Sequence, residues 1–138
     1  MKTDLQKSKV YSWETENIAP YDTNTVPFCQ IESIVKYIWH SEGLSNPPLV
    51  EKISKNCKKA GDATRTIVRF RETTYTWIIL HELAHAMASL VTGETNCHGA
   101  LFMGLYIKMV KRYLNLDVLE SAIEKGLRVK EDAIPCFI

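Results

Sequence analysis

Two histidines and a glutamate near the middle of the chain have the spacing of a metal-binding helix. His81, Glu82 and His85 form the segment HELAH. On an α-helix, residues four apart share one face, so both imidazoles can reach one metal ion. Glu82 then lies beside a water on that metal and can act as a general base. The pattern is typical of a zinc hydrolase.

The residues around this segment favour a buried helix. No Gly or Pro occurs between Arg71 and Val91, and the flanks WIIL and AMASL are mostly apolar. Two histidines and a glutamate are costly to bury without partners, and a metal ion is the simplest partner for all three. The sequence therefore predicts Zn2+ as the cofactor.

A catalytic zinc ion needs three protein ligands and one open position. The metzincin spacing would put the third ligand at Val91, which cannot bind a metal, and this excludes that subclass. A thermolysin-like site would need a Glu on a second helix well downstream. Glu94 follows the first helix too closely for that role. The other later glutamates lie in or beyond a separate C-terminal segment: Glu120, Glu124 and Glu131.

His98 is the remaining candidate for the third ligand. It follows a short loop that contains Gly93, and it opens a second predicted helix, His98 to Leu114. If this helix packs back on the first one, His98 comes close to the other two imidazoles. Cys97 is a rival because thiolates bind zinc well, but a thiolate lowers the Lewis acidity that a hydrolase needs. The predicted metal ligands are therefore His81, His85 and His98.

At these two segments the sequence resembles the SprT-like (Spartan-type) zinc metalloproteases. In that family HExxH is followed, after a loop, by a helix that begins His-Gly-x-x-Phe, and that His is the third zinc ligand. Here those positions are His98, Gly99 and Phe102. The chain is similar in particular to small phage and bacterial metallohydrolases of the same type, which share an early Lys-Val-Tyr and a Pro-Pro. The likeness extends loosely over about residues 9–129.

One departure from the family concerns nucleic acid. SprT-like enzymes often carry a C-terminal zinc ribbon or another DNA-binding extension, and we expect none here. The cysteines are scattered, without the paired spacing of a zinc ribbon: Cys29, Cys57, Cys97 and Cys136. A role on DNA is weakened accordingly.

The resemblance implies a zinc metallopeptidase that acts on protein or peptide substrates. The zinc would lower the pKa of a bound water, and Glu82 would take the proton and pass it to the leaving amine. Glu94 and Asn96 have the chemistry to hold a ligating imidazole in place. Two other classes stay open: a zinc hydrolase of a non-peptide amide, and a zinc-stabilised binding or regulatory protein with little turnover.

The segment Thr64 to Phe70 alternates apolar and basic residues, which predicts a strand. In the zinc proteases that this chain resembles, the strand before the metal helix is a sheet edge that binds extended substrate. The predicted substrate-binding residues are Ile67, Val68 and Arg69.

The same region is locally basic. Between positions 51 and 71 the sequence has two acidic residues and seven basic ones: Lys52, Lys55, Lys58, Lys59, Arg65, Arg69 and Arg71. Such an excess could contact phosphates, so nucleic acid is a second possible partner. Aromatic residues that would stack on single-stranded bases are not interleaved with these charges.

The remaining patterns predict an α+β, zincin-like fold with a small mixed sheet packed against the metal-binding helix pair. Asp117, with Glu120 three residues on, has the pattern of a capping box and predicts the start of a last helix that stops near Gly126. The other expected elements are a strand over Lys9–Trp13, a helix over Cys29–His40, and strands over Leu49–Asn56 and Thr64–Phe70 that are joined by a turn around Gly61-Asp62.

Composition sets the outer bounds. The chain has 138 residues, of which 46% are hydrophobic, and a net charge of +1. We expect one minimal metallopeptidase-like domain over 1–138, with a core at about 9–129 and a tail over 130–138. No segment is apolar enough to cross a membrane, and residues 1–10 lack the apolar core of a signal peptide. These features predict a cytoplasmic protein, without a membrane partner and with reduced thiols.

Overall fold

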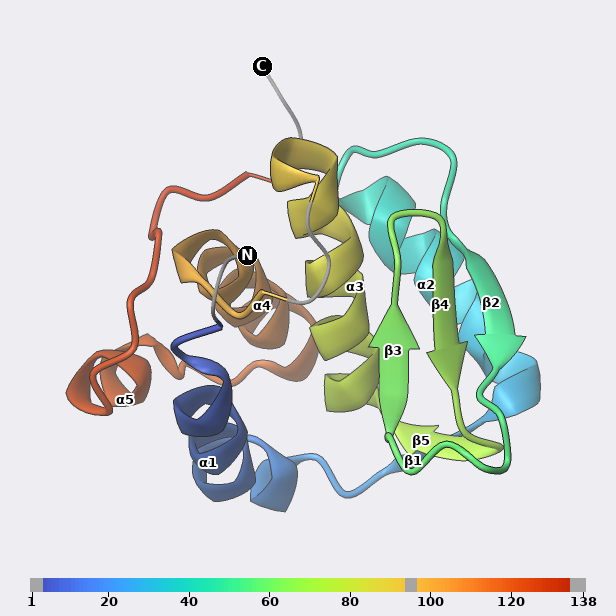
Figure 1. Cartoon of the computed structure of the whole chain (residues 1–138), viewed down its shortest axis with the longest axis horizontal. Coiled ribbons are helices and arrows are strands. Elements are labelled where there is room, and N and C mark those ends of the chain that lie inside the picture. The colour runs from blue at the N-terminus through green and yellow to red at the C-terminus, as the bar shows by residue number, and fades with distance from the viewer. Residues whose placement is uncertain (1–3, 94–96, 135–138) are drawn as a thin grey trace.

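The computed structural model describes residues 4–93 and 97–134 and shows an α+β arrangement around a central helix. Figure 1 shows this helix, α3, with a small sheet on one side and α1, α4 and α5 on the other. In chain order the elements are α1 (Lys7–Asn17), η1 (Ala19–Tyr21), β1 (Thr25–Pro27), α2 (Phe28–Ser41), β2 (Leu49–Lys52), β3 (Gly61–Ala63), β4 (Ile67–Phe70), β5 (Thr73–Tyr75), α3 (Thr76–Thr92), α4 (Ala100–Leu114) and α5 (Leu119–Glu124).

The larger sheet is mixed and has the strand order β2-β4-β3. β2 and β4 run parallel, with Leu49 opposite Ile67, whereas β3 and β4 run antiparallel, with Asp62 opposite Arg69. Strands β1 and β5 form a separate antiparallel pair. The predicted α+β class with a small mixed sheet is confirmed. Because β4 lies in the middle, the two edges of the sheet are β2 and β3.

The strand predicted over Lys9–Trp13 is wrong, because these residues belong to helix α1. Val10, Trp13 and Glu14 are buried, and their spacing of three and one puts them on one helical face. Five residues are too few to separate this spacing from the alternation of a strand. The side chains of α1 therefore reach the interior once per turn.

The turn predicted around Gly61-Asp62 is also wrong, since both residues lie in strand β3. The hairpin that joins β3 to β4 turns later, where the Thr64 N–H donates to the Ile67 carbonyl at 2.8 Å. The Thr64 hydroxyl oxygen accepts from the Ile67 N–H at 3.0 Å and stabilises the turn. The predicted strand Thr64–Phe70 is correspondingly shorter at this end and begins at Ile67. The predicted strand Leu49–Asn56 is shorter at its C-terminus and ends at Lys52.

The predicted helices are confirmed, with differences at their ends. α2 matches the expected helix within one residue at each end. α4 begins at Ala100, so His98 precedes the helix instead of opening it. α5 begins at Leu119 without a side-chain cap, and the Asp117 carboxylate accepts from Lys111 Nζ at 3.4 Å. The predicted capping box is therefore wrong, although the helix does end just before Gly126.

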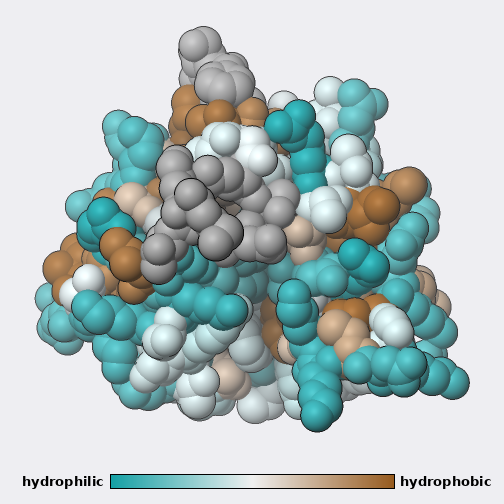
Figure 2. All heavy atoms as spheres, in the orientation of Figure 1, coloured by the Kyte–Doolittle hydropathy of each residue, from teal (hydrophilic) through white to brown (hydrophobic). Residues whose placement is uncertain are grey.

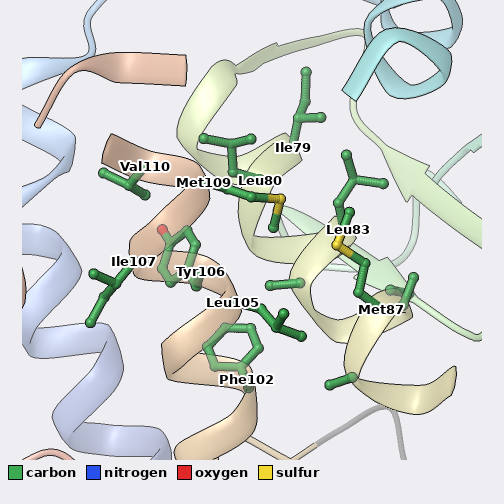
Figure 3. Packing of buried hydrophobic residues seen from close by; sticks show 14 of the residues in the cluster. Ile79, Leu80, Leu83, Met87, Phe102, Leu105, Tyr106, Ile107, Met109 and Val110 are labelled. Carbon is green, nitrogen blue, oxygen red and sulfur yellow. The ribbon is translucent and has the colours of Figure 1, made fainter. Parts of the chain in front are cut away.

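The core is thickest where α3 packs against α4 (Figure 3). Each fully buried aliphatic or aromatic side chain of this kind contributes about 1.5–3 kcal/mol, so the two helices are held firmly against each other. Figure 3 labels buried side chains of both helices: Ile79, Leu80, Leu83 and Met87 of α3, and Phe102, Leu105, Tyr106, Ile107, Met109 and Val110 of α4.

The stretch after α5 lies over α4. A Cβ at Gly104 would overlap the carbonyl oxygen of Lys130, so only glycine permits this approach. The Lys130 N–H also donates to the Ala100 carbonyl at 2.9 Å. Among the helices of the described residues, none has both the length and the apolar character that a bilayer span requires.

Candidate metal centre

Helix α3 carries the HELAH segment through the middle of the protein. His81, Glu82 and His85 are 6%, 7% and 6% exposed, so all three polar side chains are buried. One helical turn separates the two histidines, and their ring centroids lie 4.9 Å apart. The helix ends at Gly93, whose φ of 77° is the left-handed conformation that glycine adopts without strain. The predicted buried helix is confirmed.

His98 joins the two helical histidines from the residues that precede α4. Its Nε2 lies 3.1 Å from Nε2 of His85 and 3.3 Å from Nε2 of His81. A tetrahedral zinc ion with Zn–N bonds of about 2.0–2.1 Å holds its nitrogens about 3.3–3.4 Å apart. The two Nε2 distances from His98 are close to this value, and one ligand atom from each of the three imidazoles lies within 4.8 Å of the others.

The outer nitrogens of two of these rings are fixed by carboxylates. His81 Nδ1 lies 2.6 Å from Glu14 Oε2, and His98 Nδ1 lies 2.6 Å from Asp4 Oδ2. An ionised carboxylate only accepts hydrogen bonds, so each Nδ1 carries the proton and donates it. When both rings are neutral, their Nε2 atoms both carry lone pairs and lie 3.3 Å apart. A cation between the rings relieves this conflict, so the donor set fits a metal ion.

The electrostatics of the three imidazoles differ. Burial, with the neighbouring rings of His81 and His98 adding, lowers the pKa of His85 to about 2, so His85 is the neutral imidazole that a metal needs. Burial also lowers the pKa of His98, against the opposing hydrogen bond with Asp4. Burial lowers the pKa of His81 too, but the charge and hydrogen bond of Glu14 outweigh it, and the net shift is upward.

Phe102 and Cys97 flank the third histidine. The Phe102 ring stacks on the face of the His85 ring, with 4.4 Å between their centroids, and so restricts the orientation of that imidazole. Cys97 is half-buried, and its sulfur is not part of the cluster of converging ligand atoms. Of the two residues that the sequence offered as the third ligand, the structure brings His98 to the other imidazoles.

Glu82 lies beside this cluster and has a carboxylate that makes no hydrogen bond to any described residue. A Cβ at Gly61 would lie 3.1 Å from Glu82 Oε2, so the absence of a side chain at this position leaves room for the carboxylate. Burial raises the pKa of Glu82 to about 7, and the negative charges of Asp62 and Glu14 add to the shift. A carboxyl group with a pKa near neutrality can both take and give a proton.

The cluster forms the floor of an open cleft of roughly 650 Å³ between α1 and β3. Figure 2 shows this face, with hydrophilic side chains on both sides of the hollow. The edge of the His98 ring faces the Tyr11 ring, with 5.2 Å between their centroids. The cleft is lined by Lys7, Tyr11, Glu14 and Thr15 of α1, residues 59–63 at β3, Trp77, Ile78, His81, Glu82 and His85 of α3, and His98.

The predicted substrate-binding residues do not line this cleft. Ile67, Val68 and Arg69 lie in β4, whose two edges are both paired with neighbouring strands. Val68 is fully buried, and the Arg69 guanidinium donates to the Asp62 carboxylate at 2.9 Å. The prediction that β4 is an edge strand is therefore wrong, and the edge at the cleft is β3.

Several side chains of the site have no local sequence signal. Asp4 and Glu14 lie 94 and 67 residues from the histidines that they contact. Tyr11 lies in helix α1, in the segment Lys9–Trp13 for which a strand was predicted. Glu94 and Asn96, which the sequence offered as outer partners, lie outside the described residues.

Part of the basic excess between positions 51 and 71 is neutralised. Lys52 Nζ pairs with Glu72 at 2.8 Å, and Arg69 pairs with Asp62 at 2.9 Å. The Arg71 guanidinium donates to the main-chain carbonyls of the loop that precedes β3. Contact with nucleic acid stays a prediction.

Comparisons with known proteins identify no relative of this chain. No protein-family model matches the sequence, and neither a curated protein nor a solved structure is significantly similar to it. The case for a function therefore rests on the residues of the centre themselves.

Proposed function

We propose that this chain is a zinc-dependent hydrolase, and specifically a metallopeptidase of the SprT-like type. The observation that carries the proposal is the convergence of three imidazoles beside Glu82 on the floor of an open cleft, with His98 Nε2 3.1 Å from His85 Nε2 and 3.3 Å from His81 Nε2. Three protein ligands and an accessible fourth position distinguish a catalytic zinc site from a closed structural one.

The residues divide into ligands and a base. His81, His85 and His98 would hold the zinc ion, which when bound polarises a substrate carbonyl and acidifies water. Glu82 takes the proton from the attacking water and later gives it to the leaving amine. Burial raises the pKa of Glu82, which favours uptake of a proton by this carboxylate.

The free edge of β3 favours an extended peptide as the substrate. Along an antiparallel pair of strands, hydrogen-bonded residue pairs alternate with pairs that make no hydrogen bond to each other. Thr64 and Ile67 form a hydrogen-bonded pair at the turn between β3 and β4. The next such pair is Asp62 with Arg69, so the main-chain groups of Gly61 and Ala63 are directed away from β4. Both residues line the cleft, where a peptide backbone can bind to them as an added strand.

Two other functions compete with this one. A hydrolase of a non-peptide amide would use the same zinc and the same base, but it would not need the main-chain groups of β3. A zinc-stabilised binding protein would need neither that edge nor a buried carboxylate beside the metal. The position of Glu82 therefore favours turnover over binding alone.

Peptide cleavage tests this proposal. The purified protein is incubated with a defined mixture of peptides, with and without a chelator, and the products are identified by mass spectrometry. We expect cleavage that the chelator abolishes and that added zinc restores. Cleavage of simple amides but not of peptides would support the first alternative, and bound zinc without any hydrolysis would support the second.

A further inference from the structure

Both carboxylates that hold the outer nitrogens of the histidines come from one short stretch, residues 4–17. Asp4 Oδ2 accepts from His98 Nδ1 and Glu14 Oε2 accepts from His81 Nδ1, each at 2.6 Å. Asp4 also accepts the main-chain N–H of His98 at 3.2 Å. This stretch therefore supports two of the three imidazoles, although neither carboxylate would touch a metal ion held between them.

Glu14 is a deeply buried carboxylate with two polar donors among the described residues. It is 3% exposed, and within residues 4–93 and 97–134 its Oε2 accepts from two groups, the His81 imidazole and the Tyr106 hydroxyl, at 2.6 Å each. Both donors are neutral when His81 is a metal ligand, so the carboxylate charge needs a cation nearby. A metal ion on the opposite nitrogen of His81 provides that charge.

The stretch is also anchored by contacts that do not involve the histidine rings. Gln6 Nε2 donates to the main-chain carbonyl of His98 at 2.8 Å and to that of Arg128 at 3.3 Å. The fully buried Trp13 donates from its indole N–H to Ser121 Oγ at 2.9 Å. α1 thus packs on the α5 side of the molecule, and its carboxylates are set at defined positions over the cluster.

We propose that Asp4 and Glu14 are positioning residues of the zinc centre, and that zinc binding is coupled to the docking of residues 4–17. This inference rests on the zinc site of the proposed function. Each carboxylate fixes the Nδ1–H tautomer of its imidazole and directs Nε2 inward. Outer partners of this kind change metal affinity by about 10- to 100-fold. Because coupling is reciprocal, zinc favours the docked stretch by the same factor.

Zinc affinity in matched variants tests the positioning role. We expect Asp4→Asn and Glu14→Gln each to weaken zinc binding by about 10- to 100-fold in competition with a chromophoric chelator. Glu16→Gln is the control, because Glu16 lies on the same helix but is exposed, and its contacts in the described part of the chain are with Ser12 and Lys125, away from the histidines. With cobalt(II) in place of zinc, the visible spectrum should shift in the two variants and not in the control, because the basicity of a coordinated imidazole changes.

Amide hydrogen exchange tests the coupling in the same proteins. Zinc should slow exchange in α1 of the parent chain, and this zinc-dependent part should be lost in the double variant Asp4→Asn/Glu14→Gln. Unfolding in the presence of chelator shows whether the variants fold. Variants with the zinc affinity and cobalt spectrum of the parent would overturn the inference while the peptidase proposal stands. If the variants bound zinc more weakly but the parent chain cleaved no peptide, the inference would stand and the peptidase proposal would fail. A parent chain that does not bind zinc would overturn both the inference and the peptidase proposal.

Discussion

Replacement of Glu82 by Gln is expected to lower hydrolysis by about 10²–10⁴-fold and to leave the metal in place, because this is the usual contribution of a general base. Gln has the same shape as Glu, so it fits the space that Gly61 leaves. It cannot take a proton from water. None of the three imidazoles depends on the Glu82 carboxylate for a hydrogen bond. The rate of cleavage of one chosen peptide, measured at equal zinc occupancy, checks the expectation.

Glu51→Gln is the matched control for this change, because Glu51 is an exposed glutamate on β2, away from the cleft. It should cleave at the parental rate. If Glu82→Gln also cleaved at the parental rate, Glu82 would not be the base, and the proposed mechanism would fail. If Glu82→Gln lost its zinc, Glu82 would be part of the metal site and the ligand set would have to be revised.

Replacement of His98 by Ala is expected to weaken zinc binding by more than about 100-fold, since loss of a direct ligand exceeds the 10–100-fold effect of an outer partner. The Nε2 of His98 lies within 3.3 Å of both other Nε2 atoms, so it is placed to bind the same ion as His81 and His85. Competition with a chelator of known affinity measures the loss. The free energy of unfolding, measured in chelator, separates metal loss from misfolding.

Cys97→Ser is the companion variant, because Cys97 is the neighbouring residue with a competing zinc ligand. Its sulfur lies outside the converging group, so zinc affinity should stay well above that of His98→Ala and close to that of the parent. A strong loss in Cys97→Ser with little change in His98→Ala would reassign the third position to the thiolate.

The centre of the site was predictable from sequence because its signals are local. The four-residue spacing of His81 and His85 fixes one face of a helix, and a helix of apolar residues around them has to be buried. His98 was predictable because a short loop joins the two helices, and helices with a short connection usually pack against each other. For these residues, position in the chain largely determines position in space.

The support of the site was not predictable, because it depends on contacts between distant segments. Nothing near Asp4 or Glu14 indicates that these residues reach His98 and His81. The strand predicted over Lys9–Trp13 made this harder, since a strand would have directed alternate side chains to opposite faces.

The order of the sheet was misread for the same physical reason. β4 is central because β2 pairs with it in parallel, and such a pairing is set by the whole crossover between them. Gly61 has low strand propensity, and a turn was the better local interpretation. In the folded protein the position is a strand residue, and glycine suits it because Glu82 packs directly against it.

X-ray absorption at the zinc edge, on protein purified without chelator, tests the central claim most directly. The proposed centre predicts about one zinc ion per chain, with nitrogen or oxygen neighbours at about 2.0–2.1 Å and the signature of imidazole rings. It predicts no sulfur neighbour at the Zn–S distance of about 2.3 Å. A folded protein that contains no zinc, or a zinc ion bound to sulfur, would contradict a centre built from His81, His85 and His98.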